Sequence, residues 1–468
     1  MTETKITERS TEIDLLLEKQ RKFFQSGATM PLSFRIEMLR KLRSAVQKYE
    51  KEIAMALESD LKKSEFDSFM CETGLVICEI NYLLRNIRHL AKDRMVWTPL
   101  MQFHAKSYKK PTPYGNTLIM SPWNYPFMLT LEPLADAIAA GNTAIVKPSA
   151  YSPATSAIIK KICEECFNEE YIAVVTGGRK ENAALLNKKF DFIFFTGSES
   201  VGKEVMRHAA EHLTPVLLEL GGKSPCIVDD TAWIKLTAKR LVFGKFTNCG
   251  QTCVAPDYIL CHSSVKDKLV AEIKKQIVKQ YGENPFENDG FGKIINEKHF
   301  DRIASLIDPD KVVHGGQLNR ETLQIAPTVM DNVTWDDAVM QQEIFGPVMP
   351  ILTFDSYDEI YDLLADKAKP LALYIFSQNQ KKIKEITSRC RFGGGCINDT
   401  LMHISVNAMG FGGVGESGMG SYHGRDGFNA FSHTKGILRR YNWIDIPVRY
   451  NPHPFEKWDS FLAHLFMR

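Results

Sequence analysis

The sequence has no excess of charge of either sign and no long apolar run. Lys and Arg number 58 against 56 Asp and Glu in 468 residues, which leaves a formal net charge of +2. This balance gives no reason to expect a nucleic-acid or acidic partner, so small molecules are the expected partners. No run of about 18 uncharged apolar residues occurs. Because Met1–Lys5 is polar and no apolar signal segment is found, we expect a soluble body.

Paired cysteine spacing is also absent. Ten cysteines are scattered along the chain, which favours reduced thiols in the cytoplasm over a disulfide framework. Cys249 and Cys253 are four residues apart, but no suitably spaced His or Cys pair follows them. We therefore expect no metal site.

Alternating strand and helix patterns predict the fold class. A chain of this length, 44% hydrophobic, has room for two or three domains. Residues 11–95 carry apolar positions at helical spacing and predict a helical opening section. Beyond it, the expected strands are Thr117–Met120, Thr143–Val146, Tyr171–Val175 and Phe192–Phe195, and the expected helices are Phe127–Ala140, Ile158–Phe167 and a segment around Ala183–Leu186. This βαβ alternation predicts an α/β fold with a mostly parallel sheet covered on both faces.

The standard phosphate-binding motifs are incomplete. Gly197–Lys203 follows an expected strand and opens a helix, but Glu204 stands where a P-loop has a metal-binding hydroxyl. No G-x-G precedes Gly202, so the three-glycine dinucleotide fingerprint is missing too. What remains is a strand, a Gly-Ser turn and a helix N-terminus whose free amides can receive one pyrophosphate. An ordinary helix start is the alternative.

One thiol stands out from the other nine. Cys253 ends the small, polar segment Gly250-Gln251-Thr252-Cys253, which follows Glu219-Leu220-Gly221-Gly222-Lys223 along the chain. A nucleophilic cysteine and a carboxylate base are the two groups needed to capture a carbonyl and later to activate water. The alternative is that Cys253 is an inert small hydrophobic residue.

Six motifs in order resemble those of the aldehyde dehydrogenase superfamily over roughly residues 10–440. They are Pro122–Pro126, Lys147–Ser149, Phe195–Ser198, Glu219–Lys223, Gly250–Cys253 and Glu343–Pro347. Cys253–Tyr258 and Gly412–Gly424 look most like the class 3 and fatty aldehyde dehydrogenase branch. That resemblance implies a homodimer that acts on apolar aldehydes.

The resemblance also implies a task for each matched residue. Cys253 corresponds to the nucleophile, Asn124 to the oxyanion donor and Glu219 to the general base that activates water. The cofactor site, for NAD or NADP, corresponds to Trp123, Lys147, Gly197, Ser198, Glu343 and Phe345. Within it, Glu343 would hold the nicotinamide ribose beside Phe345, and Lys147 would hold the adenine-side ribose.

The implied architecture has a Rossmann-like nucleotide-binding domain, an α/β catalytic domain and a small antiparallel oligomerisation extension. We assign residues 1–98 and 115–219 to the nucleotide-binding domain and residues 220–408 to the catalytic domain. The oligomerisation extension comprises residues 99–114 and 409–440. Residues 441–468 form a C-terminal tail with Trp458, Phe461, Leu462, Leu465 and Phe466 at helical spacing. We expect an amphipathic helix there, too short to span a bilayer, that packs on the protein, covers the substrate entrance or touches a membrane surface.

Two positions depart from the pattern of the branch. Ala150 follows the Lys-Pro-Ser motif where the branch commonly has a glutamate that would oppose a 2′-phosphate, so we hypothesise that NADP is accepted as well as NAD. Cys249 stands where the branch often has serine. It could trap an oxidised Cys253 as a disulfide, and a packed small residue is the alternative.

The sequence thus predicts an NAD(P)-dependent, hydrolytic dehydrogenase of medium or long aliphatic or aromatic aldehydes, working through a Cys253 thiohemiacetal and thioester. A coenzyme-A-acylating relative is the nearest rival, and Glu219 argues against it because a water-activating base would waste the acyl group. The same scaffold could also serve as an esterase or be catalytically silent. Lys147, Glu343 and Phe345 argue against both of these functions, because they belong to the cofactor site.

Overall fold

A computed structural model describes residues 3–445, 450–451, 457–458, 460–461 and 464. Its first sheet has six strands in the order β17-β7-β6-β3-β4-β5. Five of these strands are parallel, and β17 is antiparallel to β7. The strands are β3 (Asn116–Met120), β4 (Thr143–Lys147), β5 (Ile172–Val174), β6 (Phe192–Thr196), β7 (Val216–Glu219) and β17 (Gly418–Met419). The expected strands and the α/β fold class are confirmed.

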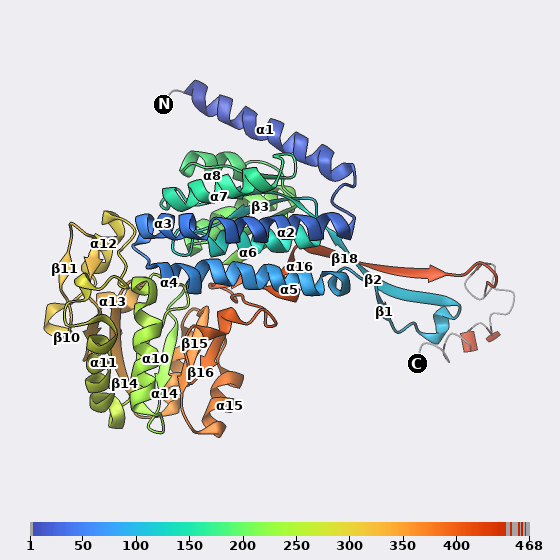
Figure 1. The fold of residues 1–468 in the computed structure, drawn as a ribbon. Coiled ribbons are helices and arrows are strands. Elements are labelled where there is room, and N and C mark those ends of the chain that lie inside the picture. Colours follow the sequence, from blue (N-terminus) through green and yellow to red (C-terminus); the bar gives the residue numbers. More distant parts are fainter. Residues whose placement is uncertain (1–2, 446–449, 452–456, 459, 462–463, 465–468) are drawn as a thin grey trace.

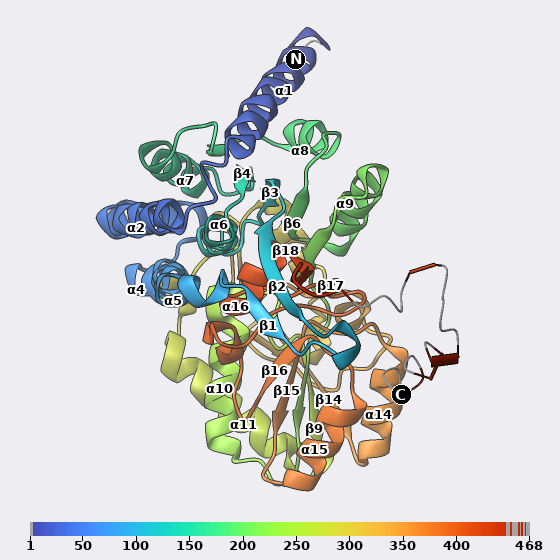
Figure 2. The same cartoon turned by 90° about the vertical axis from the view of Figure 1, so that its right-hand side faces the viewer.

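Side chains of this sheet alternate between two apolar clusters, as the period of a strand requires. On β3, Leu118 and Met120 join the cluster that contains Ile13 and Leu17, whereas Ile119 joins the opposite one. The first face is covered by α1 (Glu3–Gln25), α8 (Arg179–Leu186) and α9 (Glu199–His212). The sheet is therefore buried on both sides, as Figure 2 shows with α9 and α7 on opposite flanks.

The second face packs against α6 (Met128–Ala140), a helix whose every residue is buried. Around α6 lie the remaining helices of this region, α2 (Leu32–Lys48), α3 (Glu50–Leu61), α4 (Glu65–Ser68), a π-helical turn η1 (Phe69–Thr73), α5 (Gly74–Leu90) and α7 (Pro153–Cys166). The helical opening section expected over residues 11–95 is confirmed.

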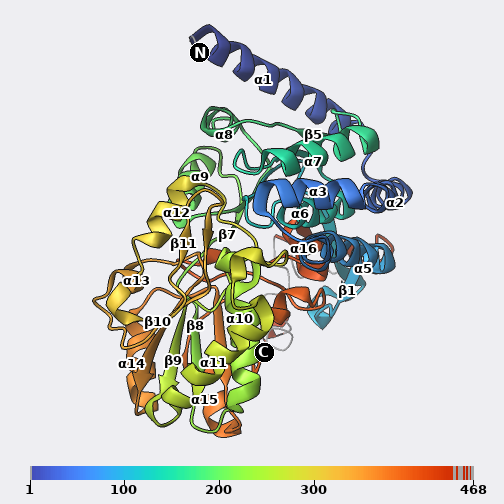
Figure 3. The same cartoon turned by 60° about the vertical axis from the view of Figure 1, so that its left-hand side comes forward.

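A second sheet of seven strands has the order β10-β13-β14-β9-β8-β15-β16, parallel apart from β10 at its edge. Its strands are β8 (Pro225–Val228), β9 (Tyr258–His262), β10 (Val312–His314), β13 (Thr328–Met330), β14 (Val348–Phe354), β15 (Ala372–Phe376) and β16 (Gly394–Ile397). The helices are α10 (Ile234–Phe246), α11 (Lys266–Tyr281), α12 (Glu297–Ala304), α13 (Ala338–Gln341), α14 (Tyr357–Asp366) and α15 (Gln380–Arg389). Figure 3 shows β7 of the first sheet above β8 and β9 of the second.

A three-stranded antiparallel sheet projects from the body of the molecule (Figure 1). It joins β1 (Arg94–Val96), β2 (Ala105–Pro113) and β18 (Ser432–Arg440), and the β2–β18 register runs from Ser432 opposite Pro113 to Arg440 opposite Ala105. Just before β18, α16 (Gly424–Ala430) packs on α5 and α6. A short hairpin of β11 (Leu318–Asn319) and β12 (Gln324–Ile325) completes the strands of the described chain.

The predicted tail helix falls largely outside the described residues. Leu462, Leu465 and Phe466 are not among those described, and Trp458 and Phe461 are exposed with ring centroids 6.1 Å apart. Among the described residues, no helix has the length and apolar content needed to cross a membrane.

Candidate active site

A cavity of about 320 Å³ lies where the carboxyl ends of β6 and β7 face the loops of the second sheet. Ligands of open α/β sheets bind at this edge. Its lining residues are Pro122, Trp123, Asn124, Thr196, Gly197, Ser198, Glu219, Leu220, Gly221, Cys253, His299, Arg302, Gln342, Glu343 and Phe345. The structure therefore brings every predicted site residue except Lys147 into one cavity.

The loop that carries Cys253 has a backbone shape that few sequences tolerate. Asn248 and Cys249 both have a positive φ, 52° and 54°, and Gly250 follows at 71°. A side chain at Gly250 would meet the carbonyl oxygen of Gly346 at 2.2 Å, so only glycine fits. The buried amide of Gln251 then ties this loop to its neighbours, donating to the Lys293 carbonyl at 3.0 Å and accepting from the Ile295 amide at 3.0 Å.

The thiol of Cys253 lies half-buried in the cavity wall. Burial raises its pKa to about 12, and the carboxylates of Glu343 and Glu219 add to the rise because like charges oppose formation of the thiolate. In the unliganded protein the group is therefore a thiol at neutral pH.

The side chain of Asn124 lies against the loop that carries Cys253 and is buried. Its Nδ2 atom donates to the Gln251 carbonyl at 3.0 Å, and an amide nitrogen has a second N–H to offer. The neighbouring Tyr125 hydroxyl is 2.7 Å from the Thr252 hydroxyl. Asn124 is thus anchored on the same loop that presents Cys253, as an oxyanion donor requires.

Glu219 ends β7 and is buried, with 2% of its surface exposed. Neither carboxylate oxygen has a hydrogen-bond partner within the described chain. Burial raises the pKa of Glu219 well above its ordinary value. A buried carboxyl with two unused oxygens facing a cavity is a group that a bound molecule or water would complete.

Glu343 is framed by three charged residues, Lys223 and Asp257 from loops and Arg302 from α12. Lys223 Nζ donates to the carbonyl of Gln342 at 2.9 Å, and Arg302 donates to the carbonyls of Glu343 and Ile344 at 3.2 and 2.6 Å. Burial, together with the nearby Asp257 carboxylate, raises the pKa of Glu343 to about 8. These bonds hold the backbone on both sides of Glu343, and the Gly222 amide donates to its carboxyl.

Phe345 and Trp123 form one wall of the cavity, with ring centroids 5.4 Å apart in an edge-to-face arrangement. Gly197 and Ser198 also line the cavity and precede α9, so the N-terminus of that helix borders it. A side chain at Gly197 would meet the Phe195 ring at 2.6 Å. An aromatic wall, a helix N-terminus and the Glu343 carboxyl in one cavity fit a dinucleotide.

Lys147 lies outside this cavity, at the end of β4, with 3% of its surface exposed. Its Nζ atom donates to the carbonyls of Pro148 and Gly177 at 2.9 and 2.7 Å, which leaves one of three donors free. Burial lowers the pKa of Lys147 to about 8. The nearby Ala150, which follows the same motif, is exposed.

Three lining residues, His299, Arg302 and Gln342, belong to no predicted motif. His299 and Arg302 come from α12, which buries Phe300 and Ile303 in the second core. The His299 ring lies 5.2 Å from that of Trp123, and burial lowers its pKa. An amphipathic helix without a motif gives no signal that its other face borders a cavity.

Cys249 and Cys253 pack against different parts of the protein. Cys249 is 1% exposed and belongs to the core cluster that includes Phe291 and Ile294, whereas Cys253 packs against the other cluster. Burial raises the pKa of Cys249 to about 12. These surroundings favour the packed-residue interpretation of Cys249 over the disulfide trap.

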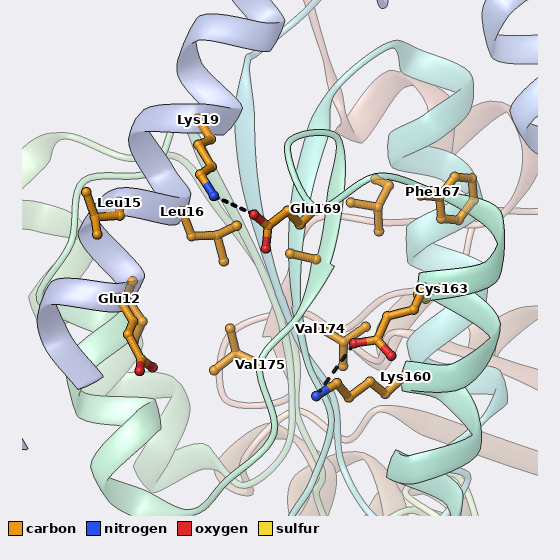
Figure 4. A pocket seen from close by; sticks show the side chains of 14 residues that line it. Glu12, Leu15, Leu16, Lys19, Lys160, Cys163, Phe167, Glu169, Val174 and Val175 are labelled. Atoms are coloured by element: carbon orange, nitrogen blue, oxygen red, sulfur yellow. Dashed lines mark hydrogen bonds and ion pairs between the residues drawn. The ribbon is translucent and has the colours of Figure 1, made fainter. Parts of the chain in front are cut away.

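A second cavity, of about 400 Å³, lies between α1 and α7 beside β5 (Figure 4). Leu16, Phe167 and Val174 line it, and an ion pair between Lys19 and Glu169 crosses its rim at 2.6 Å. No predicted site residue reaches it. The catalytic candidates therefore all belong to the first cavity or its border.

Comparison with known proteins identifies the family. The sequence profile of the aldehyde dehydrogenase family matches residues 4–437. The chain belongs to the aldehyde dehydrogenase family. This enzyme is 46% identical over 433 residues to the 4,4'-diaponeurosporen-aldehyde dehydrogenase of Staphylococcus aureus, covering 92% of the present chain and 94% of the relative. It is 44% identical to aldehyde dehydrogenase family 3 member A2 of Rattus norvegicus, over 90% of this chain and 87% of that one. These matches confirm the resemblance to the class 3 branch.

Solved structures agree with the assignment. The substrate-bound state of Staphylococcus aureus AldH superimposes with a TM-score of 0.95 at 44% identity, covering 97% of this aldehyde dehydrogenase and 99% of that chain. An NAD-dependent aldehyde dehydrogenase from Sinorhizobium meliloti gives a TM-score of 0.84 at 26% identity, over 93% and 89% of the two chains. The aldehyde dehydrogenase fold is therefore confirmed over nearly the whole molecule.

Proposed function

We propose that this aldehyde dehydrogenase oxidises apolar aldehydes, aromatic or medium to long aliphatic, to carboxylates with NAD or NADP and water. One observation carries the proposal: Cys253, Asn124 and Glu219 line a single cavity together with Glu343, Phe345 and the N-terminus of α9. A nucleophile, an oxyanion donor and a base share that space with surfaces that fit a dinucleotide.

The first half of the reaction forms a covalent adduct. The Cys253 thiol gives up its proton to water and its sulfur attacks the aldehyde carbon. The carbonyl oxygen becomes an oxyanion that accepts hydrogen bonds from the second Asn124 N–H and the Cys253 backbone amide. When bound, the oxidised nicotinamide supplies a positive charge and accepts the hydride. Its nucleotide would be held by Glu343, Phe345, Trp123, Gly197 and Ser198, with Lys147 on the adenine side.

The second half removes the acyl group from Cys253. Once the hydride has left, the carbon is a thioester, and Glu219 takes a proton from water as the water oxygen attacks. The C–S bond then breaks, the carboxylic acid leaves and the Cys253 thiol is restored. A positive charge in the cavity favours the ionised forms of both Cys253 and Glu219, which burial alone keeps neutral.

Aromatic surroundings of the site support an apolar substrate. A separate cavity of about 360 Å³ is lined by Tyr125 and Asn248, from the segments that carry Asn124 and Cys253. Its aromatic wall is completed by the rings of Phe66, Phe243, Phe246 and Tyr281. Such a wall favours aldehydes with a hydrocarbon or aromatic group over charged ones.

We propose that NADP is accepted as well as NAD, because the exposed Ala150 leaves no carboxylate at that position to oppose a 2′-phosphate. A relative from Canis lupus familiaris, 41% identical over 444 residues, bears the name dimeric NADP-preferring aldehyde dehydrogenase. Ala150→Glu is expected to lower kcat/KM for NADP about tenfold and to leave NAD unchanged, since a like charge nearby costs about 1 kcal/mol or more. Ala150→Gln, of similar size but neutral, is the control. An equal fall in kcat/KM with NAD and NADP would contradict the prediction that the Glu side chain repels the 2′-phosphate.

We also propose that two copies of the chain form a homodimer in the cytoplasm. On and after β1, at the projecting sheet, large apolar side chains are exposed, among them Trp97 at 80%, Leu100 at 69% and Met95 at 60%. Exposed apolar side chains that gather in a patch are typical of an interface. All ten cysteines, each within the described part of the chain, are free, which fits a reducing compartment. Contact of the tail with a membrane surface stays a prediction.

Cofactor reduction tests the proposed function. Absorbance at 340 nm is followed with NAD or NADP and aldehydes from acetaldehyde to dodecanal and benzaldehyde, with and without coenzyme A. Reduction without coenzyme A that Cys253→Ala abolishes is the expected result. Reduction only with coenzyme A would move the protein to the acylating class, ester turnover indifferent to nucleotide would make it an esterase, and absence of cofactor binding would make it a silent scaffold.

A further inference from the structure

Directly behind Asn124 lies a buried ion pair that the proposed mechanism does not use. Lys63 and Glu72 are joined through Nζ and Oε1, and their side chains are 4% and 0% exposed. Lys63 follows α3, and Glu72 comes from the π-helical turn η1. Neither residue lines the catalytic cavity. A π-helical turn often occurs at functional sites because it displaces one side chain from the regular helical position.

Glu72 holds the start of α6. Its second oxygen, Oε2, accepts from the backbone amides of Phe127 and Met128 at 2.8 and 3.0 Å. These amides belong to the first turn of the helix that follows the Pro-Trp-Asn-Tyr-Pro motif. The carboxylate therefore connects Lys63 to the segment immediately after Asn124.

Lys63 acts on the other side of the same segment. Its Nζ donates to the Asn124 carbonyl at 2.9 Å and lies 4.0 Å from the centre of the Tyr125 ring. Asn248 Nδ2 donates to the same carbonyl at 2.9 Å. Because a carbonyl oxygen has two lone pairs, these two bonds saturate it and fix the peptide that joins Asn124 to Tyr125.

Fixing that peptide also fixes the direction of the Asn124 side chain. The side-chain amide has one anchor, the Gln251 carbonyl at 3.0 Å, and Asn248 Nδ2 contacts the same carbonyl at 3.2 Å. Without Lys63, one of the two bonds that orient the Asn124 backbone is lost. A displacement of about 1 Å at a catalytic group costs on the order of 100-fold in rate.

We infer that Lys63 is a positioning residue that aims the Asn124 amide at the oxyanion, with Glu72 holding Lys63 in place; the inference rests on the proposed function. A buried ion pair adds little net stability, since desolvation offsets the attraction. A positioning role explains why two charges are buried beside this one loop.

The test uses a neutral pair. Lys63→Met with Glu72→Gln removes both charges and keeps an amide oxygen for the Phe127 and Met128 N–H groups. The expected result is a fall of about 10- to 100-fold in kcat for aldehyde oxidation and for ester hydrolysis, with unchanged cofactor Kd. When the two substitutions are combined with Asn124→Ala, kcat is expected to fall less than about threefold below that of Asn124→Ala alone. The reason is that the ion pair acts on catalysis through Asn124.

Lys188→Met provides a matched control. Lys188 is 18% exposed and paired with Asp14 on α1, far from the loop, and its loss is expected to leave kcat unchanged. Lys63→Arg, which keeps a charged donor, is expected to retain most of kcat. If the neutral pair does not fold, Lys63→Gln serves instead: it still donates to Glu72 but is too short to reach the Asn124 carbonyl as well.

Two results would overturn the inference. One is a wild-type kcat in the Lys63→Met, Glu72→Gln variant. The other is a fall in kcat that is as large in the Asn124→Ala background as in the wild-type background. A crystal structure of the variant gives a readout independent of turnover: the Asn124–Gln251 bond is expected to be broken or lengthened, and an unchanged bond rejects the inference even if the wild-type protein proves inactive. Absence of wild-type turnover alone would reject only the proposed function.

Discussion

Each ionisable residue of the site has its pKa shifted by the same cause, removal from water. Burial raises the pKa of Cys253 to about 12 and that of Glu343 to about 8, and it lowers the pKa of Lys147 to about 8. Every shift favours the neutral form of its group. At neutral pH the Cys253 thiol and the Glu343 carboxyl are therefore mainly neutral in the unliganded cavity, and a bound cation would favour their ionised forms, whereas Lys147, outside the cavity, stays mainly charged.

Alkylation of Cys253 tests whether its thiol is neutral in the cofactor-free enzyme. Because the thiolate is the reactive form, its labelling by iodoacetamide in the cofactor-free enzyme is expected to rise about tenfold per pH unit from pH 7 to 10 without a plateau, as a pKa of about 12 requires. Mass spectrometry follows the labelled peptide, with Cys253→Ala as the blank. A plateau near pH 8 would show an already activated thiol.

Glu219→Gln is expected to separate the two halves of the reaction. The amide is nearly the same size but cannot accept the proton of water, so the thioester forms and then persists. Stopped-flow absorbance should show a burst of about one reduced cofactor per site, followed by a steady rate lowered roughly 100-fold or more. Glu204→Gln, an exposed position on α9, is the control. Steady turnover at the wild-type rate would remove Glu219 from the role of base.

At the scale of helices and strands, patterns in the sequence predicted the features that depend on residues close together in the chain. The strands β3, β4, β5 and β6 follow from short apolar runs bounded by turns, because a sheet buried on both faces leaves few polar positions. The motif residues around Cys253 and Glu219 follow from resemblance. Both kinds of signal lie within a few residues of the element they describe.

Contacts between distant segments could not be predicted in this way. Nothing in Gly418–Met419 marks a strand that pairs antiparallel with β7, and nothing in Glu65–Thr73 marks a π-helical turn. The positive φ of Asn248 is likewise imposed by packing of the loop, since asparagine tolerates that conformation without requiring it. Such features depend on tertiary contacts, for which one sequence carries no local signal.

The turn after β7 gives a prediction at this scale. A side chain at Gly221 would meet the Glu343 carboxylate at 2.3 Å, so the two loops approach each other only because residue 221 is glycine. Gly221→Ala is expected to displace Glu343 and raise the KM for cofactor about tenfold or more, with a smaller change in ester hydrolysis. Gly436→Ala on β18, where nothing lies within 4 Å, is the control. Equal cofactor KM in both variants would contradict the prediction.

For the whole molecule, the antiparallel sheet of β1, β2 and β18 projects from the body (Figure 1), and Trp97 and Leu100, in the segment between β1 and β2, are exposed. Replacing Trp97 and Leu100 by serine is expected to weaken association on the order of 100-fold, since buried aromatic anchors dominate interfaces. Light scattering after size exclusion should then report monomers. Trp233→Ser, 67% exposed at the start of α10, is the control. A dimer unaffected by the double change would place the interface elsewhere.

The pairing of β17 with β7 also determines when the enzyme becomes competent during its synthesis. Before translation reaches Gly418, Asn124, Glu219 and Cys253 have already been synthesised. The strand β17, which pairs with β7 beside Glu219, has not. Glu79 likewise accepts a hydrogen bond from the Gly424 amide, which lies 345 residues later in the chain. Contacts this remote form late in folding. A nascent or prematurely terminated chain therefore contains Cys253 without these contacts, and we expect catalysis to begin only once translation is almost complete.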